Sequence, residues 1–213
     1  MLIAPDAAYT LWAPEYNRAL NPVTALEMRV LQGKLGSLEG KCVLDAGTGT
    51  GRWMKYARSR GATVFGIDRS AAMLAQATGN RVRGDILRLP FPDDAADLAI
   101  CSMVLGYLSR PIDALLELLR VAGRVIVSDF HPAAHAAGWT RSFRAAGQVF
   151  EIEHFFHSPD GLEDPRIRMD WFTEAGFGEP ERTIFEAAGK AAQFDAACAV
   201  PVIYAAAWSR AHE

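Results

Sequence analysis

The sequence predicts an α/β fold, a doubly wound sheet with helices on both of its faces. Short apolar stretches rich in β-branched residues alternate with amphipathic stretches of helical period, and a glycine-rich turn joins the first such pair. Alternation of this kind favours parallel strands with right-handed crossovers. The chain has 213 residues, 50% of them hydrophobic, which suits one domain with a well-buried core.

The predicted elements follow one another without a linker or an internal repeat. The first is a helix over 22–36, for which Asn21 is the predicted cap and Pro22 the first residue. The helix before the fifth strand runs from Pro111 to Arg120 and carries leucine and isoleucine along one face. The predicted strands lie at 41–46, 62–67, 81–84, 97–102 and 123–129.

The C-terminal part of the chain has a different pattern. Asp164 and Pro165 predict the start of a further helix, which Gly176 would end. Glu181–Glu186 and Val200–Trp208 then have the composition of two strands, with no clear helical pattern between them.

The most informative stretch is DAGTGTGR at positions 45–52, directly after the first predicted strand. Gly47, Gly49 and Gly51 permit unusual backbone dihedrals and the close approach of a ligand. Amide groups at the start of the following helix favour a carboxylate or a phosphate. A dinucleotide-binding turn has its third glycine one position later, where this chain has Arg52. The turn therefore predicts a nucleotide-like cofactor and disfavours a nicotinamide dinucleotide.

Acidic residues stand at the ends of the next two strands. Asp68 follows the turn by about 20 residues, where a carboxylate is placed to accept both hydroxyls of a ribose. Its alternative role is a helix cap, because a helical stretch begins at Ser70. Asp85 ends the third strand, and its alternative is a turn, since Gly-Asp pairs are common in turns.

Composition and charge argue against several classes of protein. The 22 basic and 25 acidic residues nearly balance and are scattered, which disfavours a broad nucleic-acid interface. Three cysteines in apolar segments, without metal-ligand spacing, indicate buried free thiols. The N-terminal residues lack the pattern of a secretory signal, and the longest apolar run is too short for a bilayer span. We therefore expect a soluble cytoplasmic protein with no membrane partner.

The glycine turn and the acids after it resemble the first motifs of class I S-adenosylmethionine-dependent methyltransferases. The resemblance extends from about Tyr9 to Arg210 and is to the small-molecule, ubiquinone-biosynthesis-like group. Its other landmarks are WAPEYN at 12–17, SDFHP at 128–132, HS at 157–158 and EAGF at 174–177. One departure is Gly106-Tyr107, where many relatives have a histidine pair or Leu-His. Another is RVAG at 120–123, where a Lys-Pro-Gly-Gly-type turn is usual.

The resemblance implies a Rossmann-like, mostly parallel sheet whose C-terminal strand is antiparallel. It implies one domain over 1–213, with an N-terminal helical cap over 1–38, a sheet core over 39–213 and a flap at 133–165. The implied cofactor is S-adenosylmethionine, with S-adenosylhomocysteine as the product. In this family an acid after the third strand takes the adenine amino group and the next residue covers the ring. The expected cofactor-binding residues are Tyr16, Asp45, Gly47, Thr48, Gly49, Gly51, Asp68, Arg69, Met73, Asp85, Ile86 and Ser102.

The implied reaction is methyl transfer to an oxygen, nitrogen or carbon of a small-molecule acceptor. A base is needed only for an alcohol, an amine or a weakly acidic phenol, and His131 is the candidate. Tyr107 is the candidate for orienting the acceptor. Their structural alternatives are a histidine held by loop backbone and a packed aromatic ring. Histidine pairs at 131/135 and 154/157 lack the ligand set of a zinc site, so no metal is expected.

Two other functions remain open at this point. A nicotinamide-dependent oxidoreductase would use a similar fold, although Arg52 stands where its third glycine should be. A non-catalytic protein with a methyltransferase fold would bind the nucleoside and transfer nothing. The sequence leaves the acceptor and the oligomeric state open.

Overall fold

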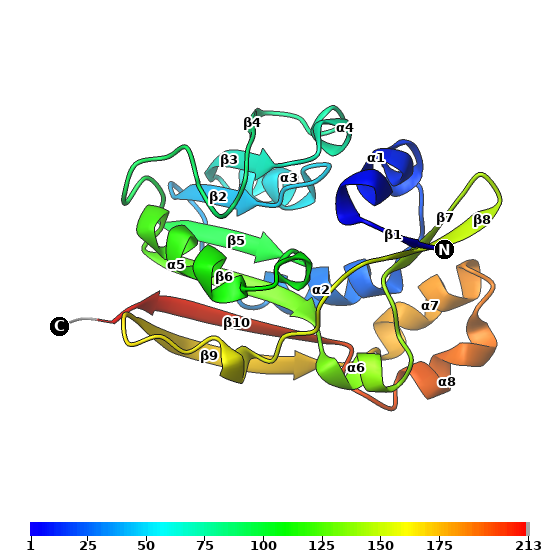
Figure 1. Ribbon diagram of the computed structural model, residues 1–213. Coiled ribbons are helices and arrows are strands. Elements are labelled where there is room, and N and C mark those ends of the chain that lie inside the picture. The colour runs from blue at the N-terminus through cyan, green and yellow to red at the C-terminus, as the bar shows by residue number, and fades with distance from the viewer. Residues whose placement is uncertain (212–213) are drawn as a thin grey trace.

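The computed structural model describes residues 1–211 and is built around a seven-stranded sheet (Figure 1). The strand order is β4-β3-β2-β5-β6-β10-β9, in which the first five are parallel and β10 runs antiparallel to both of its neighbours. This confirms the predicted fold class. The strands are β2 (Cys42–Ala46), β3 (Thr63–Asp68), β4 (Asn80–Arg83), β5 (Leu98–Ser102), β6 (Arg124–Phe130), β9 (Ile167–Ala175) and β10 (Ile203–Arg210).

Helices cover both faces of this sheet because its central strands are apolar on both sides. In Figure 1, α5 (Pro111–Val121) lies in front of the sheet, and α2 (Pro22–Gln32) and α3 (Arg52–Ser59) lie behind it. Side chains that face α5 include Leu44, Cys101 and Val127. Their immediate neighbours Val43, Ile100 and Ile126 pack with α2 and α3. This period of two makes one buried layer on each face.

A small second sheet stands at the carboxyl ends of the large sheet's parallel strands. Its order is β1-β8-β7, with β1 (Leu2–Ile3), β7 (Ser142–Ala145) and β8 (Gln148–Ile152). Helix α1 (Pro5–Tyr16) packs on it around Ala8, Phe143 and Phe150, so the chain's first residues and the segment expected to form a flap share a core. In the view of Figure 1 this unit is drawn above α7 (Glu179–Ala187).

The remaining elements are short. The turn after β5 is a single 3₁₀ turn, Leu105–Tyr107, and α4 (Ala71–Leu74) follows β3. A third apolar cluster joins α2 to the end of β6 and to α7 through Leu26, Phe130 and Phe185. The others are α6 (Pro132–Ala136), α8 (Phe194–Ala197) and the 3₁₀ turns Pro159–Gly161 and Ala191–Gln193.

The predicted helix that begins at Asp164 and Pro165 is wrong. Residues 167–175 form β9, which pairs with β10 over its whole length, and Asp164 instead binds the Arg166 guanidinium. A ladder of eight residue pairs between β9 and β10 overrides the local start and stop signals.

The predicted strand Glu181–Glu186 is also wrong, since these residues lie in α7. Pro180 is in the first turn of this helix, and the Glu181 carboxylate accepts the Gly178 backbone N–H at 3.0 Å. Glu181 and Phe185, four residues apart, are its buried residues. The short helix α8 also lies before β10, where the sequence shows no helical pattern.

All three cysteines are free thiols, with Cys101 buried and the other two half-buried. Within residues 1–211, no helix has the length and apolar character needed to cross a bilayer.

One buried hydroxyl in β10 is energetically unfavourable. Tyr204 is 0% exposed, and its hydroxyl has no hydrogen-bond partner among residues 1–211. An unsatisfied buried hydroxyl costs about 1–3 kcal/mol. We therefore expect Tyr204→Phe to raise the free energy of unfolding by about 1 kcal/mol in urea titrations. Tyr56→Phe, on a half-buried ring of α3, is the control and should change it little. A less stable Tyr204→Phe protein would contradict this account.

Candidate active site

A cavity of about 1000 Å³ lies at the carboxyl ends of β2, β3 and β5. Its walls come from the glycine turn, the turn after β5, helix α1 and strand β7. Ligand pockets usually measure about 300–1,000 Å³, so this one has room for two molecules that react with each other. Its position agrees with the general rule for open α/β sheets, whose ligands bind beyond the carboxyl ends of the strands.

The glycine turn has a backbone that other residues would strain. Gly47, Gly49 and Gly51 have φ values of 72°, 56° and 84°. A Cβ on Gly47 would lie 2.2 Å from a methyl carbon of Val104. Gly51 caps α3 and packs against Ala77, so it shapes the turn and does not line the cavity.

The Asp68 carboxylate is organised by backbone amides and faces the cavity. It accepts the N–H groups of Gly49 and Ser70, each at 2.8 Å. An ionised carboxylate offers about four acceptor positions, so two are left for a pair of ligand hydroxyls. Burial raises the pKa of Asp68, against these two hydrogen bonds. Ser70 itself caps α4 by accepting the Met73 N–H, so the cap role falls to Ser70 rather than Asp68.

The structure brings most of the expected cofactor residues together around this cavity. Arg69, Met73, Asp85 and Ile86 line the part beyond β3 and β4, as expected for the side of an adenine ring. The full set of expected cofactor residues that line it is Tyr16, Asp45, Gly47, Thr48, Gly49, Asp68, Arg69, Met73, Asp85, Ile86 and Ser102. Gly51 is the exception described above.

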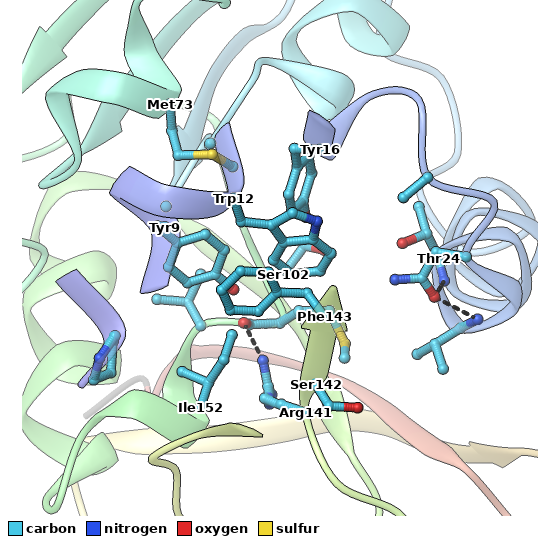
Figure 2. A pocket seen from close by; sticks show the side chains of 18 of the residues that line it. Tyr9, Trp12, Tyr16, Thr24, Met73, Ser102, Arg141, Ser142, Phe143 and Ile152 are labelled. Carbon is cyan, nitrogen blue, oxygen red and sulfur yellow. Dashed lines mark hydrogen bonds between the residues drawn. The ribbon is translucent and has the colours of Figure 1, made fainter. Parts of the chain in front are cut away.

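Helix α1 forms the roof of the cavity. Trp12 stacks on Phe143 of β7 at 4.9 Å between ring centroids, and Tyr9 lies 6.1 Å from Trp12. Figure 2 shows these rings together, with Met73 on one side and Arg141 on the other. An ion pair of 2.7 Å joins Asp6 of this roof helix to Arg69, the residue after β3.

His131 is not brought to the cavity, contrary to its predicted role as a base. It caps α6, where its Nδ1 accepts the Ala133 N–H at 3.0 Å. Its Nε2 lies 2.8 Å from the Glu174 carboxylate of β9. His131 is absent from the cavity lining, so its geometry matches the structural alternative of a histidine held in a loop.

Asp45 is a buried carboxylate under the glycine turn. It accepts the Thr48 hydroxyl at 2.6 Å and the Met54 N–H at 3.0 Å. Burial outweighs these hydrogen bonds and raises its pKa to about 6. Asp45 thus links the end of β2 to the start of α3 and lines the cavity.

A second buried carboxylate, Glu27, was missed by the sequence analysis. Its Oε1 accepts the Trp53 indole N–H at 3.1 Å and the hydroxyls of Ser102 and Ser128 at 2.7 and 2.8 Å. Its Oε2 accepts Arg52 Nη1 at 2.5 Å. The signal was available, because Glu27 lies four residues from both Val23 and Leu31 on the buried face of α2.

A buried ion pair that was also missed lies below the roof. Arg141, 7% exposed, binds Asp129, 3% exposed, and only Arg141 lines the cavity. Arg141 Nη1 also donates to the Tyr107 hydroxyl at 3.0 Å, and that hydroxyl lies 2.6 Å from the Tyr9 hydroxyl. Tyr107, the predicted acceptor-orienting residue, therefore lines the cavity as part of a fixed network.

The Asp129 carboxylate is fully engaged. It accepts the Gly106 and Phe130 N–H groups, each at 2.7 Å, in addition to Arg141. A Cβ on Gly106 would fall 3.1 Å from Arg141 Nη2 and 3.0 Å from the Phe155 carbonyl oxygen. The glycine at this position therefore makes room for the ion pair. Within residues 1–211, no three His, Cys, Asp or Glu side chains group as metal ligands would.

Comparison with known proteins agrees with this geometry. The family model described as "Methyltransferase domain" matches residues 44–127. The malonyl-[acyl-carrier protein] O-methyltransferase of Serratia marcescens is 36% identical over 168 residues, which are 74% of this chain and 59% of that protein. The demethylmenaquinone methyltransferase of Beutenbergia cavernae is 36% identical over 104 residues, 45% of this chain and 43% of that protein. The chain therefore spans about three fifths, or less, of these relatives' length.

A solved structure shares the fold. The S-adenosylmethionine-dependent methyltransferase of Mesorhizobium loti superimposes with a TM-score of 0.65 at 22% identity, covering 89% of this chain and all of that one. A doubly wound sheet with an antiparallel C-terminal strand and a glycine turn followed by Asp68 defines the class I methyltransferase architecture. Residues 44–127 therefore match a methyltransferase domain, and the chain has the fold of the class I S-adenosylmethionine-dependent methyltransferases. The expected cofactor is S-adenosylmethionine.

Removing the charge of Glu27 should destabilise the protein. Glu27→Gln keeps the shape but leaves Arg52 without its carboxylate and places an amide N–H₂ among donors. We expect the free energy of unfolding to fall by about 2–4 kcal/mol in urea titrations. Glu15→Gln, in an exposed pair with Arg18, is the matched control and should change it by less than about 0.5 kcal/mol. Equal stability of both variants would contradict the role given to Glu27.

Asp45 should make stability fall as pH rises. Its folded pKa, about 6, lies above the ordinary value of 3.8, so the folded state holds this proton more tightly than the unfolded chain does. That contribution is present below about pH 4 and is lost as pH rises through about 6. Relative to Asp45→Asn, the wild type should lose about 2.5 kcal/mol of unfolding free energy between pH 4 and 7. A pH-independent difference between the two proteins would refute the raised pKa.

Proposed function

We propose that this protein transfers the methyl group of S-adenosylmethionine to an oxygen, nitrogen or carbon of a small-molecule acceptor. The observation that carries the proposal is one cavity with two parts. One part contains the glycine turn, Asp68 and Asp85, and the other lies under the roof beside Tyr107 and Arg141. The turn after β5 lies between them, which is where a donor and an acceptor would meet.

The residues present fit the cofactor. Asp68 retains acceptor positions for the two ribose hydroxyls, and we assign Asp85 and Ile86 to the adenine amino group and ring because both line the same cavity. A side chain on Gly49 would enter this part of the cavity, where its Cβ would lie 3.3 Å from Met73 Cε. Asp45, Tyr16 and Ser102 would surround the amino-acid end. The carboxylates of Asp45, Asp68 and Asp85 suit a ligand that carries a sulfonium and an ammonium group.

Bound S-adenosylmethionine supplies a methyl carbon activated by the attached sulfonium. The protein's own contribution is then alignment and the exclusion of water, and alignment alone lowers barriers by about 7–11 kcal/mol. The stacked rings of the α1 roof would shield bound reactants from water, and Tyr107 would orient the acceptor from below the roof.

The alternatives have less support. A nicotinamide-dependent oxidoreductase would need its third glycine at the position of Arg52, which begins α3 in this chain. A protein that binds the nucleoside without transferring a group would not need the second part of the cavity. A single catalytic domain, a cytoplasmic location and the absence of a nucleic-acid partner remain predictions of the sequence, and the near balance of charge supports the last.

Calorimetric titration with S-adenosylmethionine, S-adenosylhomocysteine and NADH tests the proposal. We expect micromolar binding of the first two and none of NADH. Asp68→Ala should weaken S-adenosylmethionine binding about 5- to 150-fold, or 1–3 kcal/mol, through loss of hydrogen bonds to the ribose. Asp93→Ala, at an exposed carboxylate beside Arg120, is the control and should bind normally. Unchanged affinity in Asp68→Ala, or binding of NADH alone, would overturn the cofactor assignment.

A further inference from the structure

Among residues 1–211, the acceptor part of the cavity offers hydrogen-bond donors but no histidine and no unpaired carboxylate to act as a base. Three described histidines are committed elsewhere. His131 caps α6, the His154 ring nitrogen lies 2.6 Å from the Ile152 carbonyl, and the His157 ring nitrogen lies 2.8 Å from the Leu108 carbonyl. Along residues 1–211, no histidine lines the cavity. The carboxylates Asp6 and Glu15 that do line its roof form ion pairs with arginines. A methyl acceptor bound here must therefore carry a nucleophile that needs no deprotonation.

The hydroxyls of Tyr9 and Tyr107 form one hydrogen-bonded pair, in which either oxygen can be the donor. An arginine never accepts, so Arg141 Nη1 donates to the Tyr107 oxygen. The 2.6 Å contact between the two hydroxyls uses one of their two protons, whichever ring donates it. The second proton is left to donate to a ligand. Burial raises the pKa of Tyr9, so its hydroxyl stays protonated at neutral pH.

The group next to these hydroxyls is the guanidinium end of the Arg141–Asp129 ion pair. Asp129 lies behind Arg141 and does not line the cavity, so the guanidinium is the end of the ion pair that the ligand meets. The Arg141 guanidinium carbon lies 4.6 Å from the Tyr107 ring centroid, so the positive charge is next to the donor group. Charge-assisted hydrogen bonds of this kind are about twice as strong as neutral ones.

We propose that Tyr9 and Tyr107, positioned by Arg141, bind a carboxylate of the acceptor and that this carboxylate is the group methylated. The inference rests on the proposed function and names its substrate class. One carboxylate oxygen forms the new O–CH₃ bond as the S–CH₃ bond breaks, and the electron pair of that bond stays on sulfur. The products are a neutral methyl ester and a neutral thioether. No proton is released, which is why the site needs no base.

The other walls of this part fit an apolar body attached to the carboxylate. Met103, Phe130 and Trp139 line it together with Val23 and Phe185. The Met103 backbone has φ of 60°, a conformation rare for a non-glycine residue, at the turn where donor and acceptor would meet. Because these walls are apolar, a short aliphatic carboxylic acid is a suitable probe.

The test uses hexanoate and the neutral hexanamide, which have the same carbon skeleton. Each is titrated into protein saturated with S-adenosylhomocysteine, whose own binding is measured first. We expect the wild type to bind hexanoate at least about tenfold more tightly than hexanamide. Tyr107→Phe and Tyr9→Phe should bring this ratio close to one and leave S-adenosylhomocysteine binding unchanged. Tyr56→Phe is the control and should keep the wild-type ratio.

Arg141 is a positioning residue, and its variants separate that role from a merely structural one. Arg141→Lys keeps a buried cation beside Asp129 and should retain part of the preference for hexanoate, whereas Arg141→Met should lose it. Equal affinity of the wild type for both probes, binding of neither, or an unchanged ratio in both tyrosine variants would overturn the inference. Failure of the wild type to bind S-adenosylhomocysteine would instead overturn the proposed function, and the inference with it.

Discussion

The buried carboxylate of Glu27 is the interaction on which the site depends. A charged group with 0% exposure is costly to bury unless it is paired and hydrogen-bonded. Here Arg52 supplies the opposite charge, and Trp53, Ser102 and Ser128 supply three further donors. These partners belong to the start of α3 and to the ends of β5 and β6. One side chain of α2 thus fixes the three elements between which donor and acceptor would meet.

The two buried ion pairs of the site have the same orientation. In each, the carboxylate lies behind and the guanidinium lines the cavity, Arg52 in front of Glu27 and Arg141 in front of Asp129. Their second partners differ, however. Arg52 donates to the Ser102 hydroxyl at 3.1 Å, near the glycine turn, whereas Arg141 donates to Tyr107 under the roof. A buried carboxylate behind an arginine therefore positions side chains in both parts of the cavity.

How much of the structure can be predicted from the sequence depends on how far apart along the chain the interacting residues are. Gly47, Gly49 and Asp68 lie within one strand–turn–helix–strand unit, so spacing alone places them. The hydrogen bond from Ser128 to Glu27 joins residues 101 positions apart, which no local pattern reveals. The errors at β9 and α7 have the same origin, because pairing with β10 and contact with α2 decide those segments.

The departure from the family pattern at Gly106-Tyr107 gains a physical meaning from this argument. The resemblance implies a larger residue at the position of Gly106 in many members of the family, and a Cβ there would approach Arg141 Nη2 and the Phe155 carbonyl oxygen. A bulky residue at 106 and a guanidinium beside Asp129 therefore compete for the same space. Tyr107 in turn needs Arg141 as its donor. Gly106, Tyr107 and Arg141 thus form one interdependent set, in which a change at position 106 would alter what the site recognises.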